Sequence, residues 1–249
     1  MNKYEMLQDD KIKVSGHILY RIKALKDFSD VRVGDLGGYI ERKENLSQKG
    51  NCWVYNNACV FGNARVYDNA YVYGNARVYG NAYVYGNAYV RDNARVYEDA
   101  YVGSEMCIRD SAWVYNNACV FGNARVYEDA CVCDNARVFG EAYVYGNAHV
   151  FDNAWVGGNA KVYDNAKISK TTDVLCVSPI GSRNDVTTFF KTEDNNICVK
   201  CGCFSGTIDR FLEAVNETHG ENKHAKAYKL ACELARVQIE LEDKINENE

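Results

Sequence analysis

An aliphatic residue recurs at every sixth position from residue 54 to residue 168, and this period constrains the fold more than any other feature. The series has 20 members without a slip, of which 18 are Val. The position two residues before each later member is Ala in 18 of 19 cases, and Asn precedes that position 14 times. A period of six fits neither the 3.6-residue repeat of a helix nor the two-residue alternation of a long strand. It predicts short strands separated by tight turns.

The repeat unit also indicates how the chain closes on itself. Ala and Val lie two positions apart and therefore share one face of a strand. Gly-Asn and Asp-Asn pairs supply the corners, since Gly, Asn and Asp tolerate left-handed backbone conformations. Three strands per coil give a parallel coil with Val inside, and at 18 residues per coil the repeat makes nearly seven coils, roughly 30 Å in length.

The unit aliphatic-x-x-x-small-x resembles the repeat of the hexapeptide-repeat proteins, which fold as left-handed parallel β-helices and include acyltransferases. Residues 27–31, 37–40 and 46–53 also resemble the start of uncharacterised bacterial and phage members of that family. The left hand is implied by this resemblance alone. The resemblance further implies a homotrimer with parallel coil axes and ligand sites in the clefts between protomers.

The chain divides into three parts in a mainly β fold. Residues 1–50 predict an N-terminal β cap that covers an open sheet edge, with a hairpin in 11–25 around Ser15-Gly16. Residues 51–170 form the β-helix, and residues 171–249 predict a small C-terminal α+β domain.

Within the C-terminal domain, we expect strands over 173–178, 186–191 and 196–204. Thr207 and Asp209 mark the start of a helix that ends near Gly220. A longer helix is expected over about 222–246. Its apolar stripe packs on the sheet of the domain or, alternatively, on the other protomers of the trimer, and it consists of Tyr228, Ala231, Leu234, Val237, Leu241 and Ile245.

Charge and composition exclude several classes of function. The net charge is -5 and no segment is strongly basic, so we expect no nucleic-acid polymer as a partner. The longest apolar runs are too short to span a membrane, and the N-terminus has no secretory apolar region. We therefore expect a cytoplasmic protein, in the host cell if phage-encoded, whose 11 cysteines are reduced thiols.

Residues 105–111 interrupt the repeat and resemble a translated sequencing-transposon end. The segment that follows, 112–130, is identical to residues 52–70 at 16 of 19 positions. Both observations indicate an assembly junction, so the natural number of coils can differ. The segment nevertheless keeps the period, with Ile108 at a core position and Met106 where Ala belongs, which overpacks the core.

Aromatic and arginine side chains occupy the outward positions of the repeat. One interpretation is that they stack between coils and stabilise them; the other is that they form an interface with ligand-binding clefts. For the second, the candidate ligand-binding residues are Arg77, Arg95, Tyr83, Tyr101, Trp113, Arg137 and Trp155.

The C-terminal domain contributes a further candidate at Ser182 and Arg183. These residues follow a glycine in a turn, where backbone N–H groups and a guanidinium can bind a phosphate; an ordinary hairpin turn is the alternative. Cys198, Cys201 and Cys203 are close together, but their strand-like alternation disfavours zinc. Most cysteines of the coil are expected to be surface thiols, namely Cys59, Cys119, Cys131 and Cys133, and we expect no metal.

Catalysis is not indicated. Acyltransferases of the resembled family use a His near the protomer interface as a general base, and His149 is the residue of the coil that could play that part with acetyl-CoA. The hypothesis is instead a non-enzymatic, phage-encoded homotrimer that needs no cofactor and sequesters a small nucleotide-type ligand by stacking and charge. The alternatives are an acyltransferase acting on a sugar or amino acid, and a virion-associated scaffold.

Overall fold

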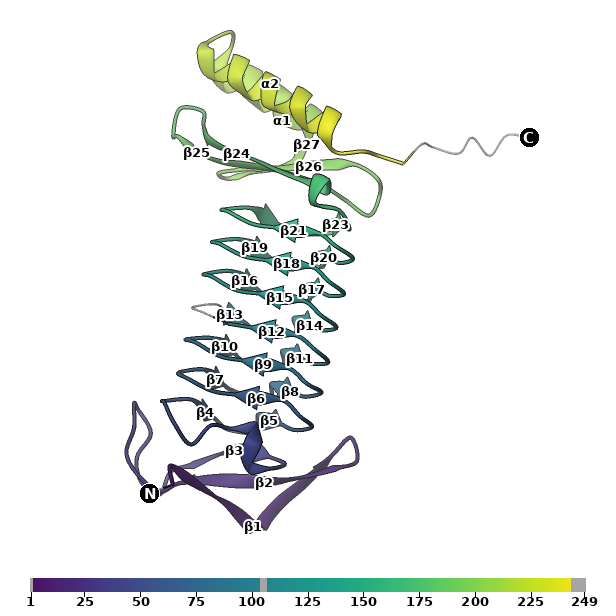
Figure 1. Cartoon of the computed structure of the whole chain (residues 1–249). Coiled ribbons are helices and arrows are strands. Elements are labelled where there is room, and N and C mark those ends of the chain that lie inside the picture. Colours follow the sequence, from purple (N-terminus) through teal and green to yellow (C-terminus); the bar gives the residue numbers. More distant parts are fainter. Residues whose placement is uncertain (1, 104–106, 243–249) are drawn as a thin grey trace, which may run out of the picture.

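The computed structural model describes residues 2–103 and 107–242. Its central part is a straight rod with the N-terminal strands at one end and helices at the other (Figure 1). The rod is a parallel β-solenoid of nearly seven coils built from two-residue strands. The mainly β, coiled fold expected from the period of six is thus confirmed, while the left hand stays a prediction.

Three stacks of strands form the sides of the solenoid among the described residues. The β5 face consists of β5 (Cys59–Val60), β8 (Arg77–Val78), β11 (Arg95–Val96), β14 (Trp113–Val114), β17 (Cys131–Val132), β20 (His149–Val150) and β23 (Lys167–Ile168). The β4 face consists of β4 (Trp53–Val54), β7 (Tyr71–Val72), β10 (Tyr89–Val90), β13 (Cys107–Ile108), β16 (Arg125–Val126), β19 (Tyr143–Val144) and β22 (Lys161–Val162). The β6 face consists of β6 (Arg65–Val66), β9 (Tyr83–Val84), β12 (Tyr101–Val102), β15 (Cys119–Val120), β18 (Arg137–Val138) and β21 (Trp155–Val156).

The aliphatic and Ala positions of the repeat fill the inside of the rod. Val90 and Ala94 are both fully buried, and Ile108 takes a core position as expected. Met106 lies outside the described residues. The small Ala beside each corner leaves room for three sheets to converge, whereas the branched Val fills the centre of each coil.

Backbone and side-chain hydrogen bonds tie each coil to the next. Tyr73 N donates to Val90 O at 2.8 Å, and the same contact recurs along every face. The Asn that precedes Ala adds a second ladder, because its amide reaches the residue one coil above: Asn63 Nδ2 donates to Asn81 Oδ1 at 2.9 Å, and Asn81 Nδ2 donates in turn to Asp99 Oδ1. Asp92 shows why the corners favour Gly, Asn and Asp, since its φ is 62°.

A hairpin begins the chain, as expected around Ser15-Gly16. Strands β1 (Tyr4–Val14) and β2 (His17–Ala24) pair antiparallel, and the two turn residues have φ values of 48° and 88°. The hairpin is longer than the range 11–25, because β1 already begins at Tyr4.

The cap merges with the solenoid through β3 (Leu36–Ile40) and the short helix η1 (Lys43–Asn45). Strand β3 pairs antiparallel with β2 and parallel with β5. Tyr39 faces Cys59, which is 20 residues further along the chain rather than 18. Residues 36–47 therefore form an extra rung, and the antiparallel hairpin closes the sheet below it.

The C-terminal domain begins with η2 (Thr171–Asp173) and contains a four-stranded antiparallel sheet within the described residues. Its elements are β24 (Val174–Ile180), β25 (Asp185–Lys191), β26 (Ile197–Cys201), β27 (Phe204–Thr207), α1 (Ile208–His219) and α2 (Lys223–Gln238). The sequence predicted one strand over 196–204, and a turn at Gly202 divides it. Thr207 caps α1 as expected. Helix α2 ends at Gln238, and residues 243–246 of the expected helix lie outside the described part.

Only the first half of the expected apolar stripe of α2 packs on the sheet of its own domain. The alternative, contact of the stripe with other protomers, stays a prediction, and Ile245 lies outside the described residues. Tyr228 and Ala231 are buried, but Leu234 is 50% and Val237 82% exposed, and Leu241 is exposed as well. The face that packs on the domain instead uses small side chains, which let α2 approach the sheet and α1 closely: Ala225, Cys232 and Ala235.

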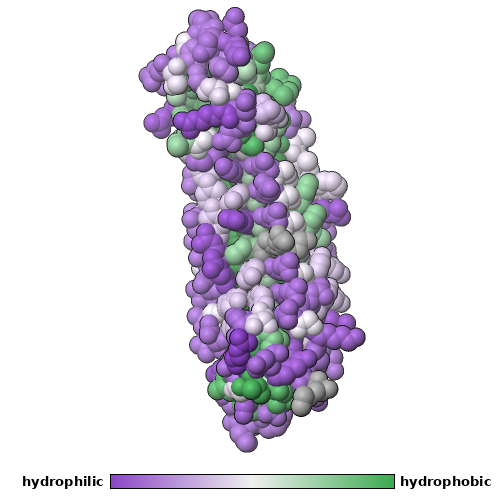
Figure 2. Space-filling view, turned by 90° about the vertical axis from the view of Figure 1, so that its left-hand side faces the viewer, coloured by the Kyte–Doolittle hydropathy of each residue, from purple (hydrophilic) through white to green (hydrophobic). Residues whose placement is uncertain are grey.

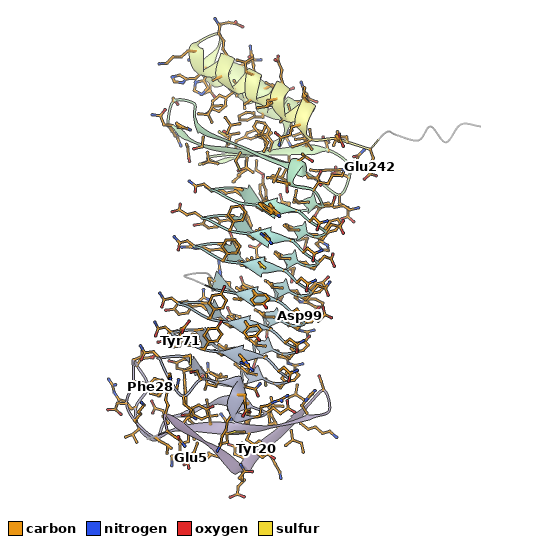
Figure 3. All side chains as sticks on the ribbon, viewed as in Figure 1. Glu5, Tyr20, Phe28, Tyr71, Asp99 and Glu242 are labelled. Carbon is orange, nitrogen blue, oxygen red and sulfur yellow. The ribbon has the colours of Figure 1, made fainter. Side chains whose placement is uncertain are left out.

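The C-terminal sheet covers the upper end of the solenoid. Lys161 N donates to Thr188 Oγ1 at 3.1 Å, and the rings of Tyr163 and Phe190 meet edge to face with centroids 5.1 Å apart. Figure 3 shows the side chains that project from the coils below, with Tyr71 and Asp99 on opposite sides of the rod. The side seen in Figure 2 is largely hydrophilic, with small apolar patches along it.

The inward position of the repeat should dominate stability. Val66→Ala removes a buried side chain and should lower the free energy of unfolding by about 2 kcal/mol. Arg65→Ala, at the exposed neighbouring position of β6, should change it by less than about 0.5 kcal/mol. Urea denaturation followed by circular dichroism measures both. An equal effect of the two substitutions would contradict the assignment of inside and outside.

Candidate functional site

A pocket of about 250 Å³ opens in the C-terminal domain. It lies between the β24–β25 turn, the β26–β27 turn and the two helices α1 and α2. Its lining combines aromatic rings with polar groups at the mouth, and consists of Ser182, Arg183, Asp185, Cys201, Gly202, Cys203, Phe204, Phe211, Ala214, Val215, Thr218, His219 and Tyr228. An apolar hollow with a few convergent polar groups is the usual form of a small-molecule site.

Aromatic side chains form the wall of this pocket. The rings of Phe204 and Phe211 are 5.1 Å apart, and Phe211 meets Tyr228 edge to face at 5.3 Å. Gly181 allows this packing, because its φ is 74° and a Cβ there would lie 1.8 Å from the Tyr228 hydroxyl. The turn before Ser182 therefore has to begin with glycine, for both backbone and steric reasons.

The polar groups at the mouth differ in their chemistry. Arg183 is exposed on the turn and offers a permanent positive charge. His219, at the end of α1, lies 5.9 Å from the ring of Tyr228. Burial, together with hydrogen bonding to the Cys201 thiol, raises the pKa of Tyr228 to about 12. Its hydroxyl therefore stays protonated at neutral pH, as a donor to an anionic or carbonyl oxygen.

The candidates Ser182 and Arg183 thus lie at the mouth of a pocket, in the company of residues that the sequence did not single out. Phe204 lies at the end of the expected strand 196–204, and Phe211 and His219 lie within the expected helix that ends near Gly220. No local motif could have identified them, since they come together only when α1 folds back over the sheet.

The solenoid candidates do not share one surface. Arg77, Arg95 and Trp113 lie on the β5 face. The other candidates belong to the β6 face, where they occupy consecutive strands on either side of Cys119: Tyr83, Tyr101, Arg137 and Trp155.

Six of these seven candidates, all except Arg77, are already stacked on a neighbour. The guanidinium carbon of Arg95 lies 5.0 Å from the Trp113 ring centroid, and that of Arg137 lies 5.0 Å from the ring centroid of Trp155. These contacts support the first of the two interpretations, in which outward side chains stabilise adjacent coils.

The β6 face also carries a shallow hollow of about 360 Å³. It lies beside Gly103, over which the ring of Tyr85 folds, since a Cβ on this glycine would lie 2.2 Å from that ring. The hollow is lined by Tyr85, Tyr101, Cys119, Phe121 and Arg137. Tyr101, Phe121 and Trp155 remain 46%, 38% and 47% exposed on this face, which makes it the most extensive exposed aromatic surface of the described solenoid.

His149, the candidate general base, is exposed on β20. Its partners in register are Cys131 on one neighbouring strand and Lys167 on the other. Neither is a carboxylate that could orient the imidazole. In the described ranges, no group of three or more His, Cys, Asp and Glu residues is placed to hold a metal ion.

The coil cysteines differ from the surface thiols that the sequence predicted. Cys59, Cys131 and Cys133 are buried, and Cys119 is partly buried. Cys59 packs with Leu19 and Tyr39 of the cap, and Cys131 lies next to Trp113 and Tyr115 of the preceding coil. Interaction with the Cys133 thiol and with the Tyr115 hydroxyl, opposed by burial, lowers the pKa of Cys131.

Comparison with known proteins supports the solenoid fold, and the matches cover only a small part of the chain. The YdcK beta solenoid repeat matches residues 64–80 and 70–86. The uncharacterized acetyltransferase YdcK of Escherichia coli (strain K12) is 49% identical over 45 residues, which are 18% of this chain and 14% of that protein. The chain therefore contains YdcK-like β-solenoid repeats. From residue 2 to 103 and from 107 to 242, no helix is long and apolar enough to cross a membrane.

Substitution of Gly181 should disturb the pocket more than substitution of its counterpart in the other turn. Gly181→Ala and Gly202→Ala both place a side chain at positive φ, which costs about 1–2 kcal/mol. The first also drives a methyl group into Tyr228, which adds about 1–3 kcal/mol, whereas Gly202 has its nearest neighbour at 4.0 Å.

Loss of the helical circular dichroism signal on heating reports this domain, because α1 and α2 belong to it. We expect Gly181→Ala to melt clearly below Gly202→Ala. Identical melting temperatures would mean that Gly181 does not hold Tyr228 in place.

Proposed function

We propose that this YdcK-like β-solenoid protein is a non-enzymatic binding protein whose C-terminal pocket holds a small ligand of the nucleotide type. The observation that carries the proposal is the pocket itself, where Phe204, Phe211 and Tyr228 surround a space of about 250 Å³ next to Arg183. Such a space accommodates one planar ring, and the anionic group of the ligand then extends to the mouth.

The chemistry of the lining supports this class of ligand. A planar ring gains from contact with aromatic walls, and a phosphate gains from the Arg183 guanidinium and from the N–H groups of the turn. Asp185 at the same mouth repels a second anionic group and offers an acceptor to a ribose hydroxyl or an exocyclic amine. We expect selection for one phosphate next to a ring rather than for a long polyphosphate.

The same proposal includes a homotrimer that associates through the β6 face. Tyr101 and Phe121 are exposed there in one hollow, and Phe139 connects Phe121 to the exposed Trp155 through ring contacts. Exposed apolar patches of this kind mark interfaces. The β5 face has one comparable exposed aromatic among the described residues, Trp113. A trimer of parallel rods brings the three C-terminal domains to one end of the assembly.

Acetyl transfer is the second candidate, and the name of the E. coli relative favours it. His149 would be the general base, and acetyl-CoA the donor. Its exposed position between Cys131 and Lys167 lacks the oriented acid–base partner that such a base needs. A scaffold role in a phage particle is the third candidate, and it needs neither the pocket nor His149.

Removal of the Arg183 guanidinium from the mouth of the pocket should weaken binding of a mononucleotide. Arg183→Ala deletes a charge-assisted contact worth about 1.5–3 kcal/mol, a loss of roughly 10- to 100-fold in affinity. Isothermal titration calorimetry of the full chain against a panel of linear and cyclic mononucleotides measures it.

Arg210→Ala is the matched control, because Arg210 is an exposed arginine of the same domain outside the pocket lining. Binding by neither the natural chain nor the variants would overturn the proposal. Turnover of acetyl-CoA that stops in His149→Ala would favour the second candidate instead.

Association through the β6 face predicts different effects for two similar tryptophans. Trp155 and Trp113 are 47% and 41% exposed and both stack on an arginine, but they lie on different faces. Trp155→Glu should shift the protein from trimer to monomer in light scattering at micromolar concentration, because it buries a charge in the interface. Trp113→Glu should leave a trimer. A monomeric natural chain would contradict the trimer.

A further inference from the structure

Two thiols lie beside each other in a recess of the solenoid surface. Cys131 is the first residue of β17 and Cys133 follows that strand, so Val132 between them points into the core while both cysteines point outward. Cys131 is nevertheless only 9% and Cys133 only 8% exposed, so both outward side chains are covered by their neighbours. Neither cysteine takes part in the proposed ligand pocket.

Larger side chains on the neighbouring coils form the walls of this recess. Cys131 lies in register with Trp113 on one neighbouring strand and with His149 on the other. Tyr115 occupies the coil before Cys133, and its hydroxyl oxygen lies 3.6 Å from Cys131 Sγ. The thiols are therefore shielded from water by aromatic groups while remaining reachable from the surface.

We propose that Cys131 and Cys133 together bind a two-coordinate thiophilic cation, Cu(I). Thiolates are soft ligands that select Cu(I) over hard cations, and a recess lined by rings does not supply the oxygen ligands that Mg²⁺ or Ca²⁺ require. As the two copper–sulfur bonds form, each thiol gives up its proton to solvent and the oxidation state of copper does not change.

The other donors near the recess exclude an ion of higher coordination number. Zinc needs four ligands, and in the described portion of the chain no group of three His, Cys, Asp or Glu residues comes together. Asp134 Oδ2 lies 3.6 Å from Cys133 Sγ, but the carboxylate already accepts from the Asn116 amide at 2.7 Å and from the Asp152 backbone at 3.4 Å. His149, although in register with Cys131, is exposed.

Competition for Cu(I) tests the pair. The reduced full chain is titrated anaerobically with Cu(I) against a chromogenic chelator, and the bound equivalents are compared with those of Cys131→Ser, Cys133→Ser and the double variant. A shared ion predicts that each single variant loses one equivalent and that the double variant loses the same one. If each thiol bound its own Cu(I) ion, the double variant would lose two equivalents, and that result would overturn the proposal.

Two further variants separate this site from the other thiols. Cys119→Ser removes a partly buried thiol of β15, and Cys203→Ser removes an exposed one; both should retain the Cu(I) equivalent. Unchanged stoichiometry in Cys131→Ser or Cys133→Ser would overturn the site.

If the serine variants fail to fold, an alkylation experiment on the natural chain tests the same pair. One bound equivalent of Cu(I) should then protect Cys131 and Cys133 together from alkylation, as read by peptide mass spectrometry. Protection of only one of them, or of neither, would contradict binding by the pair. None of these results depends on whether the C-terminal pocket binds a nucleotide.

Discussion

The backbone hydrogen bonds between coils are the interaction on which the rest of the molecule depends. Tyr73 N to Val90 O, at 2.8 Å, is one of a series that keeps every residue above its counterpart 18 positions earlier. This register decides that Val meets Val inside the rod, that Asn63 meets Asn81 at a corner, and that Arg95 meets Trp113 outside. Because the bonds are local to adjacent coils, a small core suffices to stabilise a long rod.

Such a ladder has to stop at both ends without exposing an open edge. At the lower end, β3 adds a rung with a 20-residue offset, and the β1–β2 hairpin then continues the sheet antiparallel. At the upper end, a separate sheet lies over the last coil through Phe190 and Thr188. Its opposite face carries α1 and α2, and the pocket forms between those helices and the turns of the sheet.

Repetition explains which parts of the structure were predictable from sequence. The period of six determined the coils, the buried Val and Ala, and the corner residues, because each of these depends only on neighbours at a fixed spacing. The pocket was not predictable in the same way, since Phe211 and Tyr228 approach Ser182 only through the tertiary fold. The burial of Cys131 was missed because it depends on the size of side chains on the neighbouring coils. The partner of the apolar stripe was left open by the sequence, and Val237 in that stripe is exposed.

The near-identity of residues 52–70 and 112–130 has a geometric consequence. The two segments are 60 residues apart, which is a whole number of hexads but not of coils. Trp53 consequently lies on the β4 face and Trp113 on the β5 face, so the copied surface is rotated by a third of a turn. Gain or loss of single hexads would thus leave the core intact while changing the angle between the two end caps. The hexad is the unit of rotation in this rod, and the coil is the unit of its length.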